Sequence, residues 1–177
     1  MKKLVMAALA AAAFASPLGA AELKVKLELP KLDVAEYHRP YVAVWIERDD
    51  ASVAKNLAVW YQQPRERGAQ GNGESGTKWL PDLRQWWRRS GRSLALPVDG
   101  VTGATRPVGV HELAFSDDKA PLQGLEAGSY NLVVEAVREV GGRELLKVPF
   151  QWPPKQAASA GAKGESELGA IALELIP

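Results

Sequence analysis

The chain of 177 residues contains no cysteine. This absence excludes disulfides, thiol redox chemistry, cysteine metal ligands and a cysteine nucleophile in one step. Histidine is scarce as well: His38 and His111 stand in separate segments without the spacing of a zinc site, so we expect no metal centre. The sequence also has no serine-hydrolase motif and no recognisable pair of catalytic carboxylates, and it therefore assigns no catalytic residue.

The chain has no excess of charge of either sign, with 22 Lys and Arg against 21 Asp and Glu. Nonspecific nucleic-acid binding requires a strongly basic surface, because the phosphate backbone supplies most of the affinity. A nearly neutral chain therefore argues against a nucleic-acid partner.

No apolar run approaches the roughly 20 residues that a membrane-spanning helix needs. The N-terminus instead has Lys2 and Lys3, an apolar stretch from Leu4 to Ala15, and small residues just before Glu22. This is the pattern of a cleavable secretory signal. We predict a signal peptide over residues 1–21, a periplasmic mature chain with a net charge of about −1, and no stable membrane insertion after cleavage.

Residues 22–177 are predicted to form one domain built mainly of β-strands. The first strand shows a clear period of two, since apolar residues alternate with Lys24, Lys26 and Glu28. The charged stretch 48–56 predicts one hairpin turn, and Gly141-Gly142 predicts a second turn with positive φ angles. The predicted strands are Leu23–Leu29, Tyr41–Glu47, Leu57–Gln62, Tyr130–Val140, Arg143–Trp152 and Leu168–Ile176.

One short helix is predicted between Pro81, suited to the first helical position, and Gly91, a plausible stop. Asp82 is expected in its first turn and Arg84, Arg88 and Arg89 toward its end, with the arginines and Arg92 on a solvated face. Segments 68–77 and 153–166 are predicted to be loops. About seven strands with a single helix favour an immunoglobulin-like β-sandwich. The apolar stripe of the helix comprises Trp79, Leu80, Leu83, Trp86 and Trp87.

The most informative motif is D-x-x-T-G-A-T, over residues 99–105. It resembles the acceptor sequence of bacterial periplasmic flavin transferases, found in the flavin-carrying subunits of sodium-pumping and Rnf-type electron-transfer complexes. The resemblance implies that Thr105 receives FMN through a phosphoester, as a covalent cofactor. It also implies that recognition by the transferase depends on Asp99, Thr102, Gly103 and Ala104.

The residue types in this motif suit such chemistry. A phosphoester needs an alcohol side chain, and small neighbours such as Gly103 and Ala104 let a transferase approach the backbone closely. Asp-Gly and Thr-Gly pairs are also ordinary turn residues, so a loop of this composition needs no function to explain it. The full pattern fixes five of its seven positions, however, and this favours flavin attachment.

A second resemblance spans most of the mature chain. Residues 29–47, 78–88, 102–107 and 127–130 are similar to a family of predicted periplasmic proteins, DUF2271. This resemblance implies a periplasmic role beside membrane redox proteins, often with a flavin transferase, but names no activity. The AGSY sequence at 127–130 also resembles immunoglobulin-like domains of flagellar hook-cap proteins, which bears on the fold alone.

Together these features predict a periplasmic electron-transfer flavoprotein, a redox carrier rather than a stand-alone enzyme. Its expected partners are a periplasmic flavin transferase and a membrane redox protein. The alternative is a flavin-free β-sandwich that binds another ligand. Among the six tryptophans, Trp45 and Trp60 are expected in the core, whereas one of the adjacent Trp86 and Trp87 is expected to be exposed as a neighbour of the flavin.

Overall fold

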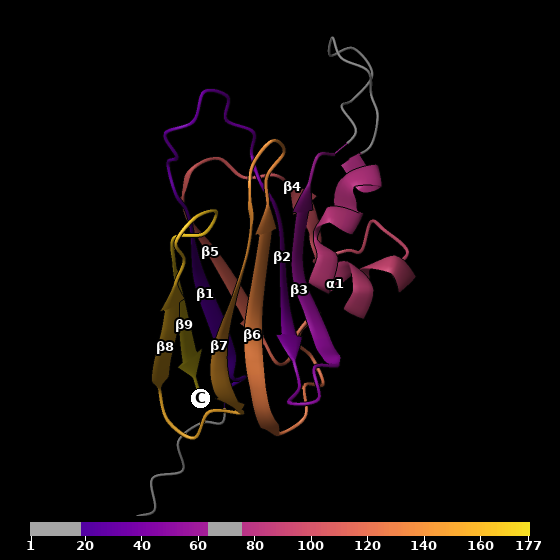
Figure 1. Cartoon of the computed structure of the whole chain (residues 1–177). Coiled ribbons are helices and arrows are strands. Elements are labelled where there is room, and N and C mark those ends of the chain that lie inside the picture. Colours follow the sequence, from indigo (N-terminus) through magenta and orange to yellow (C-terminus); the bar gives the residue numbers. More distant parts are fainter. Residues whose placement is uncertain (1–18, 64–75) are drawn as a thin grey trace, which may run out of the picture.

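Two β-sheets packed face to face form the body of the molecule (Figure 1). The computed structural model describes residues 19–63 and 76–177, so the first 18 residues of the predicted signal segment lie outside the described part of the chain. The predicted mainly β sandwich is confirmed, and the described residues form nine strands where about seven were expected. No helix among them is long and apolar enough to cross a membrane.

The strands are β1 (Glu22–Leu29), β2 (Tyr41–Glu47), β3 (Val53–Tyr61), β4 (Thr102–Ala104), β5 (Gly109–Ser116), β6 (Gly128–Val137), β7 (Arg143–Trp152), β8 (Ala158–Lys163) and β9 (Ala170–Ile176). The four-stranded sheet is antiparallel throughout and has the order β5-β1-β9-β8. In the five-stranded sheet, with the order β4-β3-β2-β6-β7, β4 runs parallel to β3 and all other neighbours are antiparallel. Each of the six predicted strands, and both predicted hairpins, is present. The predicted turn at 48–56 is shorter than expected, because β3 already begins at Val53.

The main core lies between the two sheets. The alternating apolar residues of β1 are all buried there, as the period of two predicted, and they meet every second residue of β2 and β6. Burying one such aliphatic side chain stabilises the fold by about 1.5–3 kcal/mol. The facing residues of this core include Leu23, Val25, Leu27 and Leu29 from one sheet, and Val42, Val44, Leu132 and Val134 from the other.

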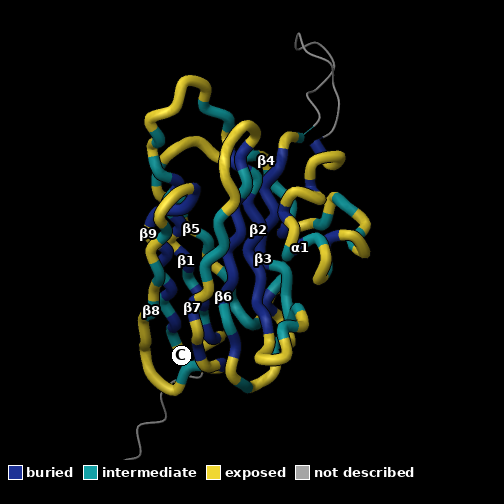
Figure 2. The backbone as a smooth tube through the Cα atoms, in the orientation of Figure 1, coloured by how far each residue is buried: buried dark blue, intermediate teal, exposed yellow. Residues whose placement is uncertain are grey.

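A second core lies on the opposite face of the five-stranded sheet. There the intervening residues Ala43, Trp45 and Val133 pack under a helical layer, which we define as residues 76–93. This layer contains a 3₁₀-helix η1 (Gly76–Asp82), the α-helix α1 (Arg84–Arg89) and a short 3₁₀-helix η2 (Gly91–Ser93). Because the main core covers one face of the five-stranded sheet and the helical layer covers the other, β2 and much of β3 are buried (Figure 2).

The predicted continuous helix from Pro81 is wrong in its details. Pro81 lies inside η1, and Leu83, with a ψ of 69°, separates η1 from α1, so Arg84 opens α1 instead of lying near its end. Asp82 belongs to η1 and is not in the first turn of α1. The negative charge at the start of α1 is supplied by a strand residue, Glu135, whose carboxylate accepts hydrogen bonds from the α1 backbone.

The two predicted loops also differ from the structure. Within 153–166, residues Ala158–Lys163 form the edge strand β8, which pairs with β9 although its small residues show no strand period. Residues 68–75 lie outside the described part of the chain, whereas Gly76 and Thr77 begin η1.

The β6–β7 turn has the predicted position but a different backbone. The positive φ angle belongs to Val140, at 54°, and not to Gly141 or Gly142. Strand β6 ends at Val137, and the Arg138 N–H donates to the Gly142 carbonyl over 3.1 Å. The turn is therefore wider than the two-residue turn that the glycine pair predicted.

Candidate functional site

The D-x-x-T-G-A-T motif begins as a tight turn. The Thr102 N–H donates to the Val98 carbonyl over 2.9 Å, and the Thr102 hydroxyl accepts from the Val98 N–H over 2.9 Å. Asp99 is exposed, and its carboxylate accepts from the Gly100 N–H over 3.0 Å. Two of the predicted recognition residues, Thr102 and Asp99, thus have a local structural role as well.

The middle of the motif is a strand and not the expected free loop. Thr102–Ala104 form β4, which pairs in parallel with residues 59–61 of β3 at the edge of the five-stranded sheet. At Gly103 a Cβ atom would lie 3.3 Å from Cδ1 of the buried Trp60, so glycine permits this close approach. The Gln63 side chain donates to the Gly103 carbonyl over 3.2 Å. These contacts fix where the chain leaves the sheet.

Thr105 follows β4 directly and is half-buried. With Ala104 it lines a cavity of about 820 Å³, which we call the Thr105 cavity. The other walls come from the approach to β2, the end of β3, η1 and the β6–β7 turn. In the five-stranded sheet, the start of β2 lies at the same end as the ends of β3, β4 and β6 (Figure 1). The cavity therefore lies at this end of the sheet.

Aromatic side chains line part of the Thr105 cavity. Trp79 is 53% exposed, and the Lys78 ammonium lies 5.4 Å from the centre of its ring. Tyr41 is half-buried, with its ring centre 6.5 Å from that of Tyr61. Burial raises the pKa of the Tyr41 phenol, against a smaller opposing effect of its hydrogen bond with the Gln62 backbone. Tyr41 is therefore a neutral hydroxyl at ordinary pH.

Charged and imidazole side chains complete this lining. Arg39 is exposed at the cavity, whereas Arg138 is buried and paired with Glu167 over 2.9 Å. His38 lies between two carboxylates, 3.2 Å from Glu36 and 3.6 Å from Glu139. Within the described residues no group of three His, Asp or Glu side chains is arranged to hold a metal ion.

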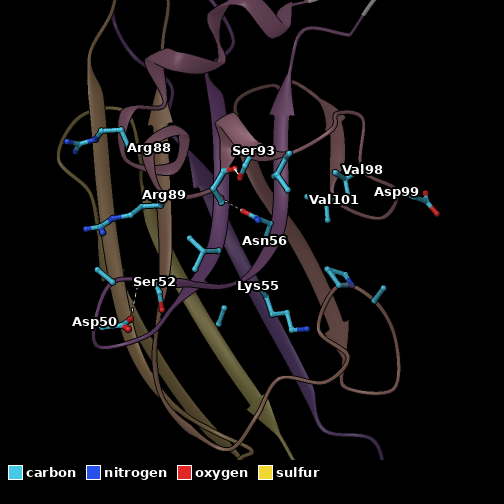
Figure 3. Close-up of a pocket in the computed structure, with 17 residues that line it drawn as sticks. Asp50, Ser52, Lys55, Asn56, Arg88, Arg89, Ser93, Val98, Asp99 and Val101 are labelled. Atoms are coloured by element: carbon cyan, nitrogen blue, oxygen red, sulfur yellow. Dashed lines mark hydrogen bonds between the residues drawn. The ribbon is translucent and has the colours of Figure 1, made fainter.

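A second cavity of about 730 Å³ lies beside α1 and the β2–β3 turn, and we call it the Asn56 cavity (Figure 3). The side-chain amide oxygen Oδ1 of Asn56 accepts from the Trp86 indole N–H over 2.8 Å and from the Ser90 hydroxyl over 3.0 Å. Asp99 borders this second cavity, with its side chain extending outward (Figure 3). The structure thus brings Ala104 and Thr105 to one cavity but leaves Asp99 at the other.

The tryptophans are arranged differently from the prediction. Trp45 and Trp60 are buried in the core as expected. Trp86 is fully buried and Trp87 is half-buried, but neither lines the Thr105 cavity. The tryptophan that does so is Trp79, which helical spacing had assigned to the buried stripe.

The sequence analysis missed two buried carboxylates on the outer face of the five-stranded sheet. Glu135 is 0% exposed and accepts from the Gln85 N–H at 3.1 Å, the Trp86 N–H at 2.8 Å and the Arg143 guanidinium. Glu47 is 1% exposed and pairs with Lys147. A glutamate within an otherwise apolar strand that is covered on both faces was the signal that could have identified them.

The residues around Thr105 fit a covalently attached FMN. Such a site needs an accessible alcohol, room for an aromatic ring and a cation or donor for the phosphate. Thr105 is half-buried rather than enclosed, and the cavity is within the range of about 300–1,000 Å³ for ligand sites. Arg39 supplies a cation, although the carboxylates of Asp82 and Glu139 line the same cavity. Trp79 and Tyr41 supply aromatic surface.

Comparison with known proteins identifies one family. Residues 22–170 match the family described as predicted periplasmic protein (DUF2271), beginning at the residue after the predicted cleavage site. No curated protein matches the chain significantly, and no solved structure does so either. The family description agrees with the predicted location of the protein in the periplasm. The match covers most of the chain, which therefore belongs to the DUF2271 family of periplasmic proteins.

Proposed function

We propose that this protein is a periplasmic electron carrier that holds FMN covalently through the hydroxyl of Thr105. The observation that carries the proposal is the position of Thr105 at the end of an edge strand, half-buried at a cavity of about 820 Å³. An edge strand leaves one side open to another protein, and a half-buried hydroxyl remains within reach of it. The ring, once attached, has a cavity beside its point of attachment.

The attachment step is a phosphoryl transfer from FAD. The Thr105 oxygen would attack the phosphorus of the FMN half, the pyrophosphate bond would break, and AMP would leave with the electron pair of that bond. The proton of the alcohol would pass to a base on the periplasmic flavin transferase. No oxidant or reductant is consumed in this step.

The residues of this chain position the reaction and do not catalyse it. The turn at 98–102 and the pairing of β4 with β3 fix the backbone before Thr105. Arg39 would neutralise part of the phosphate charge. When bound, FMN supplies the electron-transfer chemistry, and the protein supplies orientation and electrostatics. The proposed partners are therefore the transferase and a membrane redox protein that exchanges electrons with the carrier.

The test is co-expression with a periplasmic flavin transferase, followed by intact mass and in-gel flavin fluorescence of the denatured chain. We expect a mass increase of one FMN less water in the wild type and in Thr105→Ser, which keeps an alcohol. Thr105→Ala should lack it. An unmodified wild type, under conditions that label a known acceptor, would refute the proposal, and labelling of Thr105→Ala would move the site elsewhere.

The Asn56 cavity favours a second candidate function, a flavin-free binding module. It lies apart from Thr105, measures about 730 Å³ and has both polar and apolar walls, including Lys55, Asn56 and Leu94. This candidate predicts a colourless protein that stays unmodified in the same experiment.

A further inference from the structure

Trp79 is unusually exposed for a tryptophan on a well-anchored segment. Its side chain is 53% exposed, although the next residue, Leu80, is fully buried in the second core. Tryptophan has a large apolar surface, and most tryptophans in folded proteins are largely buried. An indole held at the surface beside a cavity is a typical feature of a site that binds an aromatic ring.

The backbone around Trp79 is held firmly. The Gly76 N–H donates to the Gln62 carbonyl over 2.9 Å, and the Leu83 N–H donates to the Leu80 carbonyl over 3.1 Å. At Gly76 a Cβ atom would collide with the Tyr41 hydroxyl oxygen, so η1 packs directly on the start of β2. The exposure of Trp79 therefore does not come from a loose segment.

Trp79 and Thr105 line the same cavity from different elements, η1 and the end of β4. A group tethered at one wall of a small cavity has a high effective concentration at the other walls, so a weak contact there is well populated. Other tryptophans near the five-stranded sheet are less available to contact a ring in this cavity. Trp60 and Trp86 are buried, and Trp87 does not line the cavity.

We infer that Trp79 is the stacking face for the flavin ring attached at Thr105, so that the ring occupies the Thr105 cavity instead of solvent. This inference rests on the proposed function, because it concerns the same site. Flat conjugated rings stack readily on exposed aromatic side chains, as nucleic-acid bases do in single-strand-binding proteins. Stacking on an indole also quenches flavin fluorescence, because the excited flavin accepts an electron from tryptophan.

The absence of cysteine gives a test that needs no transferase. Thr105→Cys introduces a single thiol, to which a thiol-reactive flavin is coupled. We expect the flavin emission of this conjugate to be quenched several-fold relative to the same conjugate unfolded in urea. Adding Trp79→Phe should restore most of the emission, whereas the matched change Trp87→Phe should leave it quenched.

Two results would overturn the inference: equal emission with Trp79 and with Phe at that position, or emission of the folded conjugate equal to that in urea. Circular dichroism checks that Trp79→Phe is folded. If that variant does not fold, quenching of the folded conjugate by iodide decides, since a ring in the cavity is protected and a ring in solvent is not. Failure of the proposed function appears separately, as an unmodified Thr105 in the transferase experiment.

Discussion

The outer faces of the two sheets are built in opposite ways. On the four-stranded sheet, Lys26 lies 3.4 Å from Glu174 and 3.8 Å from Glu112, and these side chains are substantially exposed. On the five-stranded sheet, the outer face is covered by the helical layer, and its carboxylates Glu47 and Glu135 are buried. Both cavities lie beside the five-stranded sheet.

The difference between the two outer faces explains why the cavities lie beside only one of the sheets. A solvated face of alternating charges needs nothing more to be stable, and it offers no enclosed volume. A face covered by short helices leaves spaces where the layer ends, and here those spaces contain Trp79, Asn56 and Thr105. The predictions below test how far the two faces differ.

The largest effect is expected from Trp86→Ala, which empties the centre of the second core. Trp86 is 0% exposed and donates to Asn56, so the loss of packing and of this hydrogen bond should cost about 3–5 kcal/mol of unfolding free energy. Urea unfolding measures it. The matched control Trp79→Ala should change stability by less than about 1 kcal/mol, because that side chain is largely exposed. Equal losses in the two variants would contradict the described packing.

The second largest loss of stability is expected from Glu135→Ala, which removes the hydrogen bonds between the Glu135 carboxylate of β6 and the backbone of α1. The change leaves the α1 N-terminus uncapped and Arg143 without its carboxylate, so we expect a loss of about 2–3 kcal/mol. Hydrogen exchange should show faster exchange of the Gln85 and Trp86 amides than in the wild type. Unchanged protection of these two amides would show that the strand carboxylate does not hold the helix.

A smaller, pH-dependent effect is expected at Glu144. Burial alone would raise the pKa of its carboxyl, but hydrogen bonds from the backbone N–H groups of Glu165, Leu168 and Ser166 outweigh it and lower the pKa below the ordinary 4.5. A lowered pKa in the folded state stabilises the protein above pH 4.5, and this contribution is lost as the pH falls through the folded-state value.

Glu144→Gln should therefore cost about 1 kcal/mol at pH 7, a value reduced for solvent exposure, and much less at pH 3. Urea unfolding at both values tests it, with the exposed Glu165→Gln as control. A loss in Glu144→Gln that is as large at pH 3 as at pH 7 would exclude the charge as its cause.

The smallest effect is expected on the solvated face. Lys26→Gln breaks exposed pairs with Glu112 and Glu174, and such pairs contribute little because water and salt screen them. The unfolding free energy should fall by less than about 0.5 kcal/mol. A loss comparable to that of Glu135→Ala would mean that the two faces do not differ as described.

The sequence predicted most strands that carry their own pattern. It missed β5, in which Leu113 and Phe115 alternate with Glu112 and Ala114 and pack against the main core. The alternation in β1 and the two hairpins are local features, and the structure has them. Strands β4 and β8 carry no such pattern: Thr102–Ala104 and Ala158–Lys163 are extended because they pair with β3 and β9. Local propensity cannot identify strands that depend on a distant partner.

The candidate site was predicted only in part, for a related reason. The D-x-x-T-G-A-T motif is local, and Thr105 was selected from it as the proposed acceptor. Trp79 was assigned to a buried helical stripe because a period of 3.6 residues was assumed, whereas η1 is a 3₁₀-helix and the chain breaks at Leu83. Its exposure beside Thr105 follows from tertiary packing, which no spacing rule contains.

The Thr105 cavity forms only when distant parts of the chain come together. Its walls come from five segments that are far apart in the chain, between His38 and Val140. An unfolded or partly assembled chain therefore has the D-x-x-T-G-A-T motif but no cavity, whereas the folded sandwich has both. The flavin emission of a labelled molecule would then also report whether that molecule had matured correctly.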